Sequence, residues 1–212
     1  MKTVPLILRF WLSAALFCLL ALSTASAKTS TWTGLGSTGV GNWGDASNWD
    51  NGVPTIEDIA VFDADGKSNM PYIGTTEQGI KQIQFNEAGW VLRSGTGGSI
   101  LFRSGDIGFF NNFASGTSTI EVDSFLNNSS GDTFNWSVPT GTTLVIDGIS
   151  YKKGNNNTLT GDGTIYLDSD NTDGTAPDAS GFTGSLLLGA NGTFNIEGGT
   201  IPSAMTGGGI GR

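Results

Sequence analysis

The stretches Thr143-Leu144-Val145-Ile146-Asp147 and Thr164-Ile165-Tyr166-Leu167-Asp168 share one pattern: threonine, apolar residue, variable residue, apolar residue, acid. The pattern returns in Thr119-Ile120-Glu121-Val122-Asp123 and Thr193-Phe194-Asn195-Ile196-Glu197, and weaker copies are Gln82-Ile83-Gln84-Phe85 and Ser99-Ile100-Leu101-Phe102. The four threonines follow one another after 24, 21 and 29 residues, a spacing typical of solenoids and repeat arrays. Because side chains alternate along a strand, the two apolar residues of each copy share one face. We therefore predict a β-solenoid with these apolar residues inside.

The alternation of apolar and polar residues predicts an all-β chain. The sequence has 33 Gly and only 14% charged residues, a mixture that on composition alone is compatible with disorder. Short segments rich in Val, Ile, Phe and Thr alternate apolar with polar residues, which is typical of strands. We expect strands separated by Gly, Asn and Ser turns.

Residues 1–27 have the three-part layout of a secretory signal peptide. Lys2 and Arg9 precede an apolar stretch at 10–22, and Ala25-Ser26-Ala27 ends the segment. The apolar stretch is short for a membrane span. We expect cleavage after Ala27, export, and no membrane span in the mature chain.

Charge and residue usage exclude several functions. The formal charge is −9, and losing Lys2 and Arg9 without any acid makes it −11, so nucleic acid is a poor partner. The single cysteine, Cys18, lies in the leader, so the mature chain has no disulfide framework. The chain has no histidine, the commonest general base and metal ligand. We predict no catalytic site and no cofactor.

The mature chain divides into a Trp- and Gly-rich N-terminal cap at 28–66 and solenoid repeats at 67–212. Trp43 and Trp49 have two interpretations. They are buried in the cap, or they form an exposed platform for sugar rings, since amphipathic aromatic side chains often lie at binding surfaces.

A turn-like acidic stretch offers weak candidates for Ca²⁺ binding at Asp168, Asp170 and Asp173. Calcium prefers oxygen ligands, but the spacing does not fit an EF-hand loop. The favoured interpretation is an inserted loop that lengthens the repeat.

The acids that end the four copies, Asp123, Asp147, Asp168 and Glu197, form a ladder if the coils are in register. Like charges about 4.8 Å apart repel by only about 1 kcal/mol in water, so a solvated ladder needs no cation. We expect these acids to cap turns.

Longer stretches resemble a known group: Thr158–Leu167, Phe182–Leu188, Asn191–Ile201, Trp32-Thr33-Gly34 and Asp58–Phe62. They are similar to bacterial secreted proteins with autotransporter-associated β-strand repeats. The resemblance implies a right-handed parallel β-helix in a Gram-negative-type bacterium, at the cell surface, outside the cell or in the periplasm. It also implies a role that is usually non-catalytic.

The sequence therefore favours a secreted or cell-surface structural or adhesion module that contacts polysaccharide or surface proteins; its oligomeric state is open. One alternative is a polysaccharide-active β-helix enzyme, a lyase or glycosidase with acids near Arg93 and Arg103; this link is a fold-level analogy. Another is a carbohydrate-binding module that uses Trp43 and Trp49.

Overall fold

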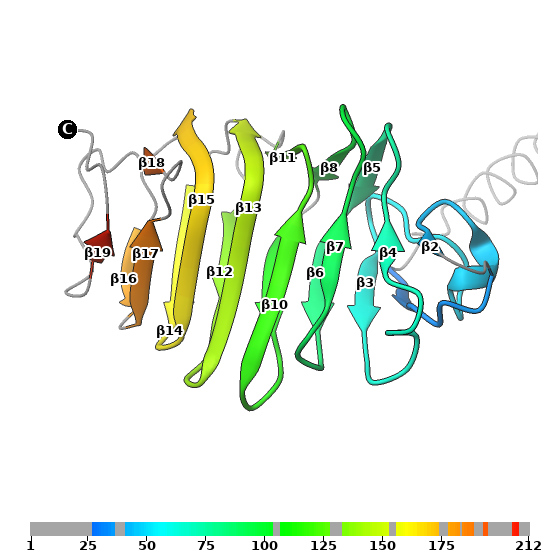
Figure 1. The fold of residues 1–212 in the computed structure, drawn as a ribbon, viewed down its shortest axis with the longest axis horizontal. Coiled ribbons are helices and arrows are strands. Elements are labelled where there is room, and N and C mark those ends of the chain that lie inside the picture. The colour runs from blue at the N-terminus through cyan, green and yellow to red at the C-terminus, as the bar shows by residue number, and fades with distance from the viewer. Residues whose placement is uncertain are drawn as a thin grey trace, which may run out of the picture.

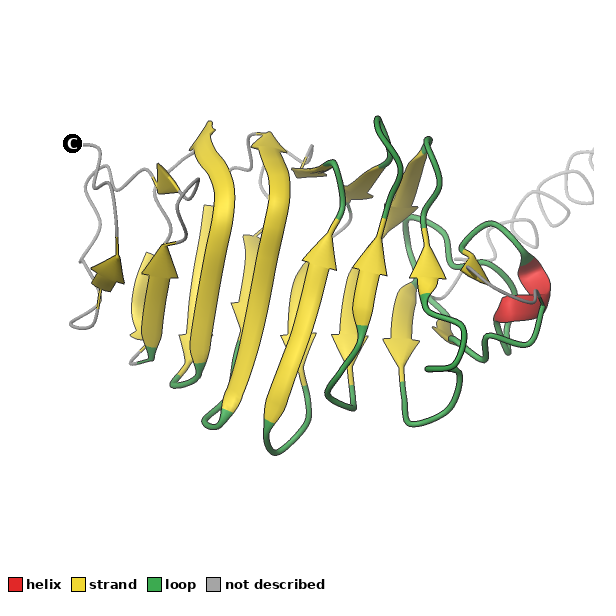
Figure 2. Ribbon diagram, viewed as in Figure 1, coloured by secondary structure: helices red, strands yellow, loops and turns green. Residues whose placement is uncertain are grey.

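A computed structural model describes residues 27–36, 41–103, 107–127, 133–152, 156–173, 178–182, 184–188, 193–194 and 205–207. The leader, apart from Ala27, and Glu197 lie outside these residues. The described chain is almost entirely strand with one short 3-10 helix, η1 (Ala46–Asn48), as Figure 2 shows. In this part of the chain, no helix is long and apolar enough to cross a membrane. The all-β prediction is confirmed.

The first sheet has seven parallel strands in the order β1-β3-β6-β9-β12-β14-β16. Their bounds are β1 (Thr29–Thr31), β3 (Ile59–Phe62), β6 (Gln82–Phe85), β9 (Ile107–Asn111), β12 (Thr133–Ser137), β14 (Asn156–Gly161) and β16 (Asp178–Phe182).

The second sheet has twelve strands and bends into two faces. One face holds β2 (Gly41–Asn42), β4 (Pro71–Tyr72), β7 (Val91–Arg93), β10 (Gly116–Glu121), β13 (Thr142–Lys152), β15 (Thr164–Asp173), β17 (Ser185–Leu188) and β19 (Met205–Gly207). The other holds β5 (Glu77–Ile80), β8 (Ser99–Phe102), β11 (Ser124–Asn127) and β18 (Thr193–Phe194). The first half of β13 pairs with β10 and its last residues pair with β11, so β13 joins the two faces.

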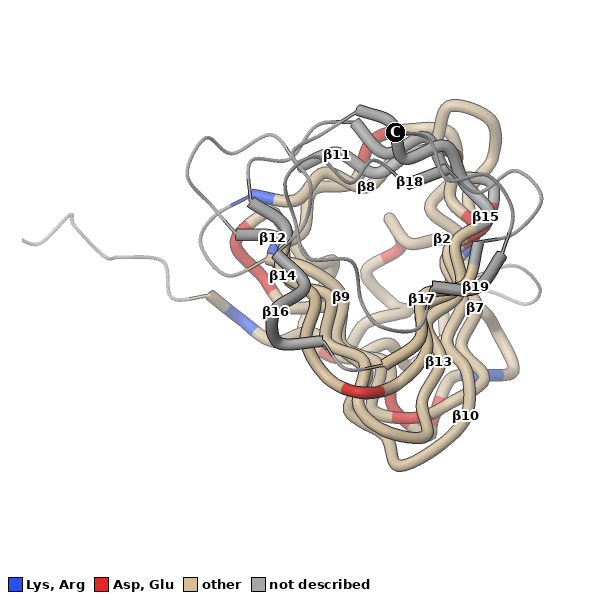
Figure 3. The backbone as a smooth tube through the Cα atoms, turned by 90° about the vertical axis from the view of Figure 1, so that its left-hand side faces the viewer, with Lys and Arg blue, Asp and Glu red and all other residues tan. Residues whose placement is uncertain are grey.

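The chain visits the three faces in turn, as the view along the stack shows (Figure 3). It runs through β3, β4 and β5, and then returns one strand further along as β6, β7 and β8. Parallel neighbours need a crossover connection, and here each coil supplies it. Figure 1 shows the resulting stack from the N-terminal end to β19. The predicted parallel β-solenoid is confirmed.

The core follows the predicted alternation. The inward apolar residues of the three described strong copies are at most 1% exposed: Ile120, Val122, Leu144, Ile146, Ile165 and Leu167. The variable residues between them, Glu121, Val145 and Tyr166, are half-buried on the outside. One face of each strand therefore lines the core and the other forms the surface.

An aromatic cluster fills the N-terminal end of the core, with Phe62 at its centre. The Phe62 ring centroid lies 5.2 Å from Trp90, 5.4 Å from Phe85, 5.9 Å from Trp49, 6.1 Å from Trp43 and 6.4 Å from Trp32. The Trp-rich stretch thus packs onto the first coils, and β3 pairs directly with β6.

A small polar network interrupts the core between β9, β10 and β13. The hydroxyl of Ser118 donates to Asn111 Oδ1 at 2.6 Å, and Asn111 Nδ2 lies 3.5 Å from Thr142 Oγ1. All three residues are at most 1% exposed. Buried polar groups need such partners, so the network ties together two faces of the coil.

The pattern copies do not form one column. Thr143 pairs with Thr164 as expected, but Thr119 pairs with Val145, two residues further along. The copies at 82–85, 99–102 and 193–194 lie on other faces, in β6, β8 and β18. The prediction that one unit recurs at a fixed place in each coil was therefore wrong. Strands on all three faces turn apolar residues toward the same core, so the same alternation appears on every face.

Candidate functional site

An open hollow of about 310 Å³ lies at the corner where β7 and β10 end. Its lining residues are Ser94, Gly95, Thr96, Glu121, Val122, Asp123 and Asp147. Parallel strands end at the same edge of a sheet, so residues from three successive coils meet here although they are far apart in the sequence.

A glycine-rich turn at 94–98 forms one wall of the hollow. The N–H of Gly97 donates to Asp123 Oδ2 at 2.8 Å, and the N–H of Asp123 donates to Ser94 Oγ at 2.8 Å. The Ser94 hydroxyl also donates to the Gly98 carbonyl at 3.2 Å. Asp123 therefore caps a turn of the preceding coil, and for this acid the expected role is confirmed.

Beside the hollow, Arg93 and Glu121 are register partners on adjacent strands. Arg93 Nε lies 2.6 Å from Glu121 Oε2, and the two side chains are 50% and 34% exposed. Exposed ion pairs contribute about 0–1 kcal/mol, so this contact orients the two side chains more than it stabilises the fold. Tyr72 is the next partner of Arg93 in the same row.

The two arginines considered for polysaccharide chemistry are not brought together. Arg93 ends β7 on one face, whereas Arg103 follows β8 on another. Only Arg93 adjoins the hollow with its acids Glu121, Asp123 and Asp147. The groups available there are the exposed carboxylates of Asp123 and Asp147 and the half-buried carboxylate of Glu121, which already contacts the Arg93 guanidinium.

Trp43 and Trp49 are 1% and 4% exposed. Their ring centroids are 4.8 Å apart in an edge contact, and Trp49 Nε1 donates to the Trp43 carbonyl at 2.8 Å. A sugar platform requires an exposed ring face. In this arrangement the two indoles instead belong to the core.

The residues considered for calcium, Asp168, Asp170 and Asp173, lie in β15. Their backbones pair with Asp147, Ser150 and Lys152 of β13. The prediction of an inserted loop here was wrong, because the long strands β13 and β15 continue around the corner between two faces of the coil. Among the residues that the structure describes, no three acids gather in a group that could hold a metal ion.

The acid ladder forms only in part. Asp147 and Asp168 are register partners, but Ile120 pairs with Ile146, so the residue that precedes Asp147 in the row is Glu121 and not Asp123. Asp123 lies two positions further along the chain and bonds to the turn.

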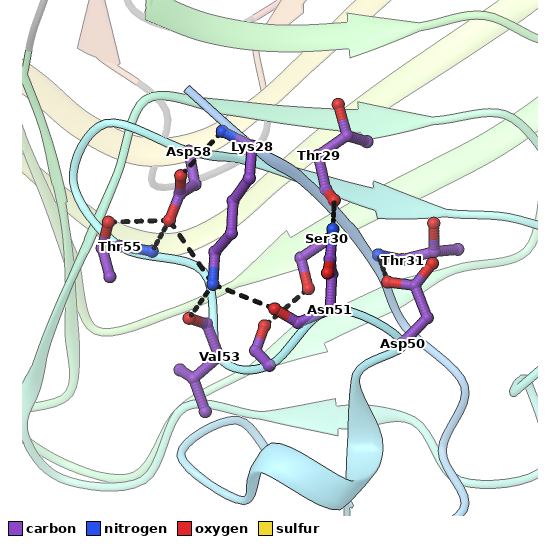
Figure 4. Close-up of polar contacts among 10 residues, drawn as sticks. Lys28, Thr29, Ser30, Thr31, Asp50, Asn51, Val53, Thr55 and Asp58 are labelled. Carbon is purple, nitrogen blue, oxygen red and sulfur yellow. Dashed lines mark hydrogen bonds and ion pairs between the residues drawn. The ribbon is translucent and has the colours of Figure 1, made fainter. Parts of the chain in front are cut away.

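A second polar site covers the outer edge of β1, the end strand of its sheet (Figure 4). The N–H of Thr31 donates to Asp50 Oδ1 at 2.7 Å, and the N–H of Asp50 donates to the Thr31 carbonyl at 3.0 Å. Asn51 Nδ2 donates to the Thr29 carbonyl at 3.1 Å. We call Asp50 and Asn51 the edge cover. Unpaired strand edges invite pairing with another chain, and the edge cover occupies these groups.

Next to the edge cover, a buried carboxylate holds the start of the described chain. Asp58 is 5% exposed, and its Oδ1 accepts from the backbone N–H of Lys28 at 3.0 Å. Its Oδ2 accepts from the N–H and the hydroxyl of Thr55, both at 2.7 Å. Burial by itself raises the pKa of Asp58, but the bonds from Thr55 and Lys28, with the Lys28 ammonium 3.8 Å away, together hold the pKa below its ordinary value.

Sequence reasoning missed both the edge cover and Asp58. A signal existed for Asp58, because Thr55 lies three residues before it and the Thr-x-x-Asp spacing suits reciprocal bonds across a turn. No comparable pattern marks Asp50 and Asn51, whose partners lie some 20 residues earlier in the chain.

Comparison with known proteins found no matching family model, no similar curated protein and no similar solved structure.

Proposed function

We propose that the protein is an exported, non-catalytic structural or adhesion module that presents the outer faces of its β-solenoid to polysaccharide or to other surface proteins. The observation that supports this best is a row of outward, half-buried residues in register across five strands: Val91, Thr119, Val145, Tyr166 and Leu187. Such a row offers shallow contacts repeated at about 4.8 Å, which suit an extended partner.

The signal-peptide layout of residues 1–27 supports export. The parallel stack is consistent with the resemblance to autotransporter-associated repeats at the level of fold alone. On this proposal the protein acts at the surface of a Gram-negative-type cell, in the extracellular space or in the periplasm.

The alternative is a polysaccharide-active enzyme, and the hollow favours it over other catalytic functions. Arg93 adjoins carboxylates from two further coils, Glu121 and Asp123 from one and Asp147 from the next. A lyase needs a cationic group to neutralise a sugar carboxylate and a base to remove a proton. The contact of Arg93 with Glu121 ties up part of that cationic charge, so we rank this alternative second.

The test incubates the chain that begins at Lys28 with insoluble and soluble polysaccharides, with and without calcium, and measures sedimented protein and released sugar ends. The structural proposal predicts binding without release, independent of calcium. If sugar ends are released, and if Glu121→Gln and Asp147→Asn each abolish this release, the structural proposal is overturned in favour of the enzyme. Leu35→Ala is the matched control, because Leu35 is 84% exposed and distant in sequence from the hollow.

A further inference from the structure

The bond that we expect to be cut during export adjoins the buried carboxylate of Asp58. Ala27 is exposed and lies outside β1, whereas the nitrogen of the next residue, Lys28, is 3.0 Å from Asp58 Oδ1. The atom that becomes the mature N-terminus therefore already faces an acid that is 5% exposed.

We propose that Asp58 is the binding site for the α-ammonium group that forms when the leader is removed between Ala27 and Lys28. This inference rests on the proposed export. An endopeptidase of the signal-peptidase class hydrolyses the bond: the hydroxyl of water adds to the Ala27 carbonyl carbon and a proton adds to the Lys28 nitrogen. The new amine takes a second proton from solvent, because an α-amino group has a pKa of about 7.7–8. A neutral donor thereby becomes a cation.

The carboxylate is oriented before cleavage. Thr55 holds Oδ2 with its N–H and its hydroxyl, which leaves Oδ1 directed at the Lys28 nitrogen. The side chain of Lys28 does not compete for Oδ1, since its Nζ donates to the carbonyls of Asn51 at 3.0 Å and Val53 at 3.2 Å. Charge-assisted hydrogen bonds are about twice as strong as neutral ones, so cleavage strengthens an existing contact without rearranging the site.

The contact also anchors the first coil. The Lys28 carbonyl accepts from the Ile59 N–H at 2.9 Å, which begins the pairing of β1 with β3. Removal of the leader thus stabilises the end of the stack, and the uncut precursor has a weaker first coil.

The test compares full-length mature chains that begin at Lys28 with chains that retain Ala27 and begin there, each with Asp58 or with Asp58→Asn. We expect the Lys28 start to lower the unfolding constant roughly tenfold and to raise the melting temperature by about 3–5 °C. Asp58→Asn should abolish the difference between the two starts. Asp50→Asn is the matched control, because Asp50 bonds to Thr31 and the difference should persist there.

Equal stability of the two starts, or a difference that persists in Asp58→Asn, would overturn the proposal. If Asp58→Asn does not fold, N-terminal acetylation of the Lys28 start provides the second comparison, since it removes the charge and keeps the length. Acetylation should then lower the melting temperature to that of the Ala27 start, and an unchanged melting temperature contradicts the binding site.

The N-terminal mass of the exported protein tests processing separately. A start at Lys28 supports the proposal, and any other start overturns its cleavage step. The stability comparison does not depend on export, so a failure of the proposed function and a failure of the Asp58 site give different results.

Discussion

Replacing Trp49 by alanine tests whether the Trp-rich stretch is part of the core. Trp49 is 4% exposed, and truncating a buried Trp costs about 3–5 kcal/mol. Its edge contacts with Trp32 at 5.0 Å and Trp43 at 4.8 Å contribute about 0.5–1.5 kcal/mol each. These terms overlap, so we expect a loss of about 4–6 kcal/mol.

Solenoid coils contact mainly their neighbours, so the loss should be local. Hydrogen exchange measures it directly. The amides of Trp32 and Ile59, which bond to the carbonyls of Val61 and Lys28, should exchange about a thousandfold to ten-thousandfold faster in Trp49→Ala. Amides of β13 and β15, several coils away, should keep their protection.

The control is Leu35→Ala, at an exposed position, which should change stability by less than about 0.5 kcal/mol. Suppose that Trp49→Ala keeps the protection of the Trp32 and Ile59 amides within tenfold and loses polysaccharide binding. The assignment of Trp49 to the core is then refuted, and Trp49 is a sugar-binding residue at the surface.

Three further outcomes follow from the polar sites. Asn111→Ala leaves a buried hydroxyl without its acceptor and should cost about 2–3 kcal/mol in urea unfolding, whereas the exposed Asn112→Ala should cost under about 0.5; equal effects would contradict the buried network. Asp50→Ala frees the Thr31 N–H at the outer edge of β1 and should produce dimers or larger assemblies in light scattering at high concentration; a monomer at all concentrations would show that the Asp50 side chain is not needed to protect this edge. The pKa of Asp58 is lowered in the folded chain, so its stabilisation is present above the ordinary pKa of about 3.9 and is lost as pH falls through the lower folded value. Stability of Asp58→Asn should therefore vary less with pH in that acid range, and identical pH profiles would argue against the lowered pKa.

The inward face of the coils was predictable from sequence. In β13 and β15 the apolar residues Leu144, Ile146, Ile165 and Leu167 alternate without interruption, and each is at most 1% exposed. The alternation of apolar and polar residues indicates which side of a strand is buried, and it can be read from the few residues of that strand alone.

The register and the face of each strand were not predictable in the same way. Tyr72 pairs with Arg93 after 21 residues, but Arg93 pairs with Glu121 after 28. Coil length varies because the turns differ in length, so a fixed period assigned Thr119 and Thr193 to the wrong positions. The Arg93–Glu121 pair depends on this register and was therefore missed. For Asp123 the turn-capping role was expected, but the turn that it caps, with Gly97 on the preceding coil, was not predicted.

The segment at 168–173 illustrates the same limit. Its Asp, Ser and Asn residues favour a turn locally, yet pairing with β13 on one side and β18 on the other keeps it extended. Pairing with neighbouring strands overrides this local preference for a turn. The sequence of the segment alone does not reveal that pairing.

The most direct test of the solenoid measures distances along one row of its outer face. The only cysteine in the chain is Cys18, so the Lys28 start accepts pairs of spin labels without interference. Labels at Val91 combined in turn with Thr119, Val145, Tyr166 and Leu187 occupy successive strands in register. We expect backbone separations that grow by about 4.8 Å per strand, to about 19 Å for the last pair. Separations that do not increase in this order would contradict the parallel stack.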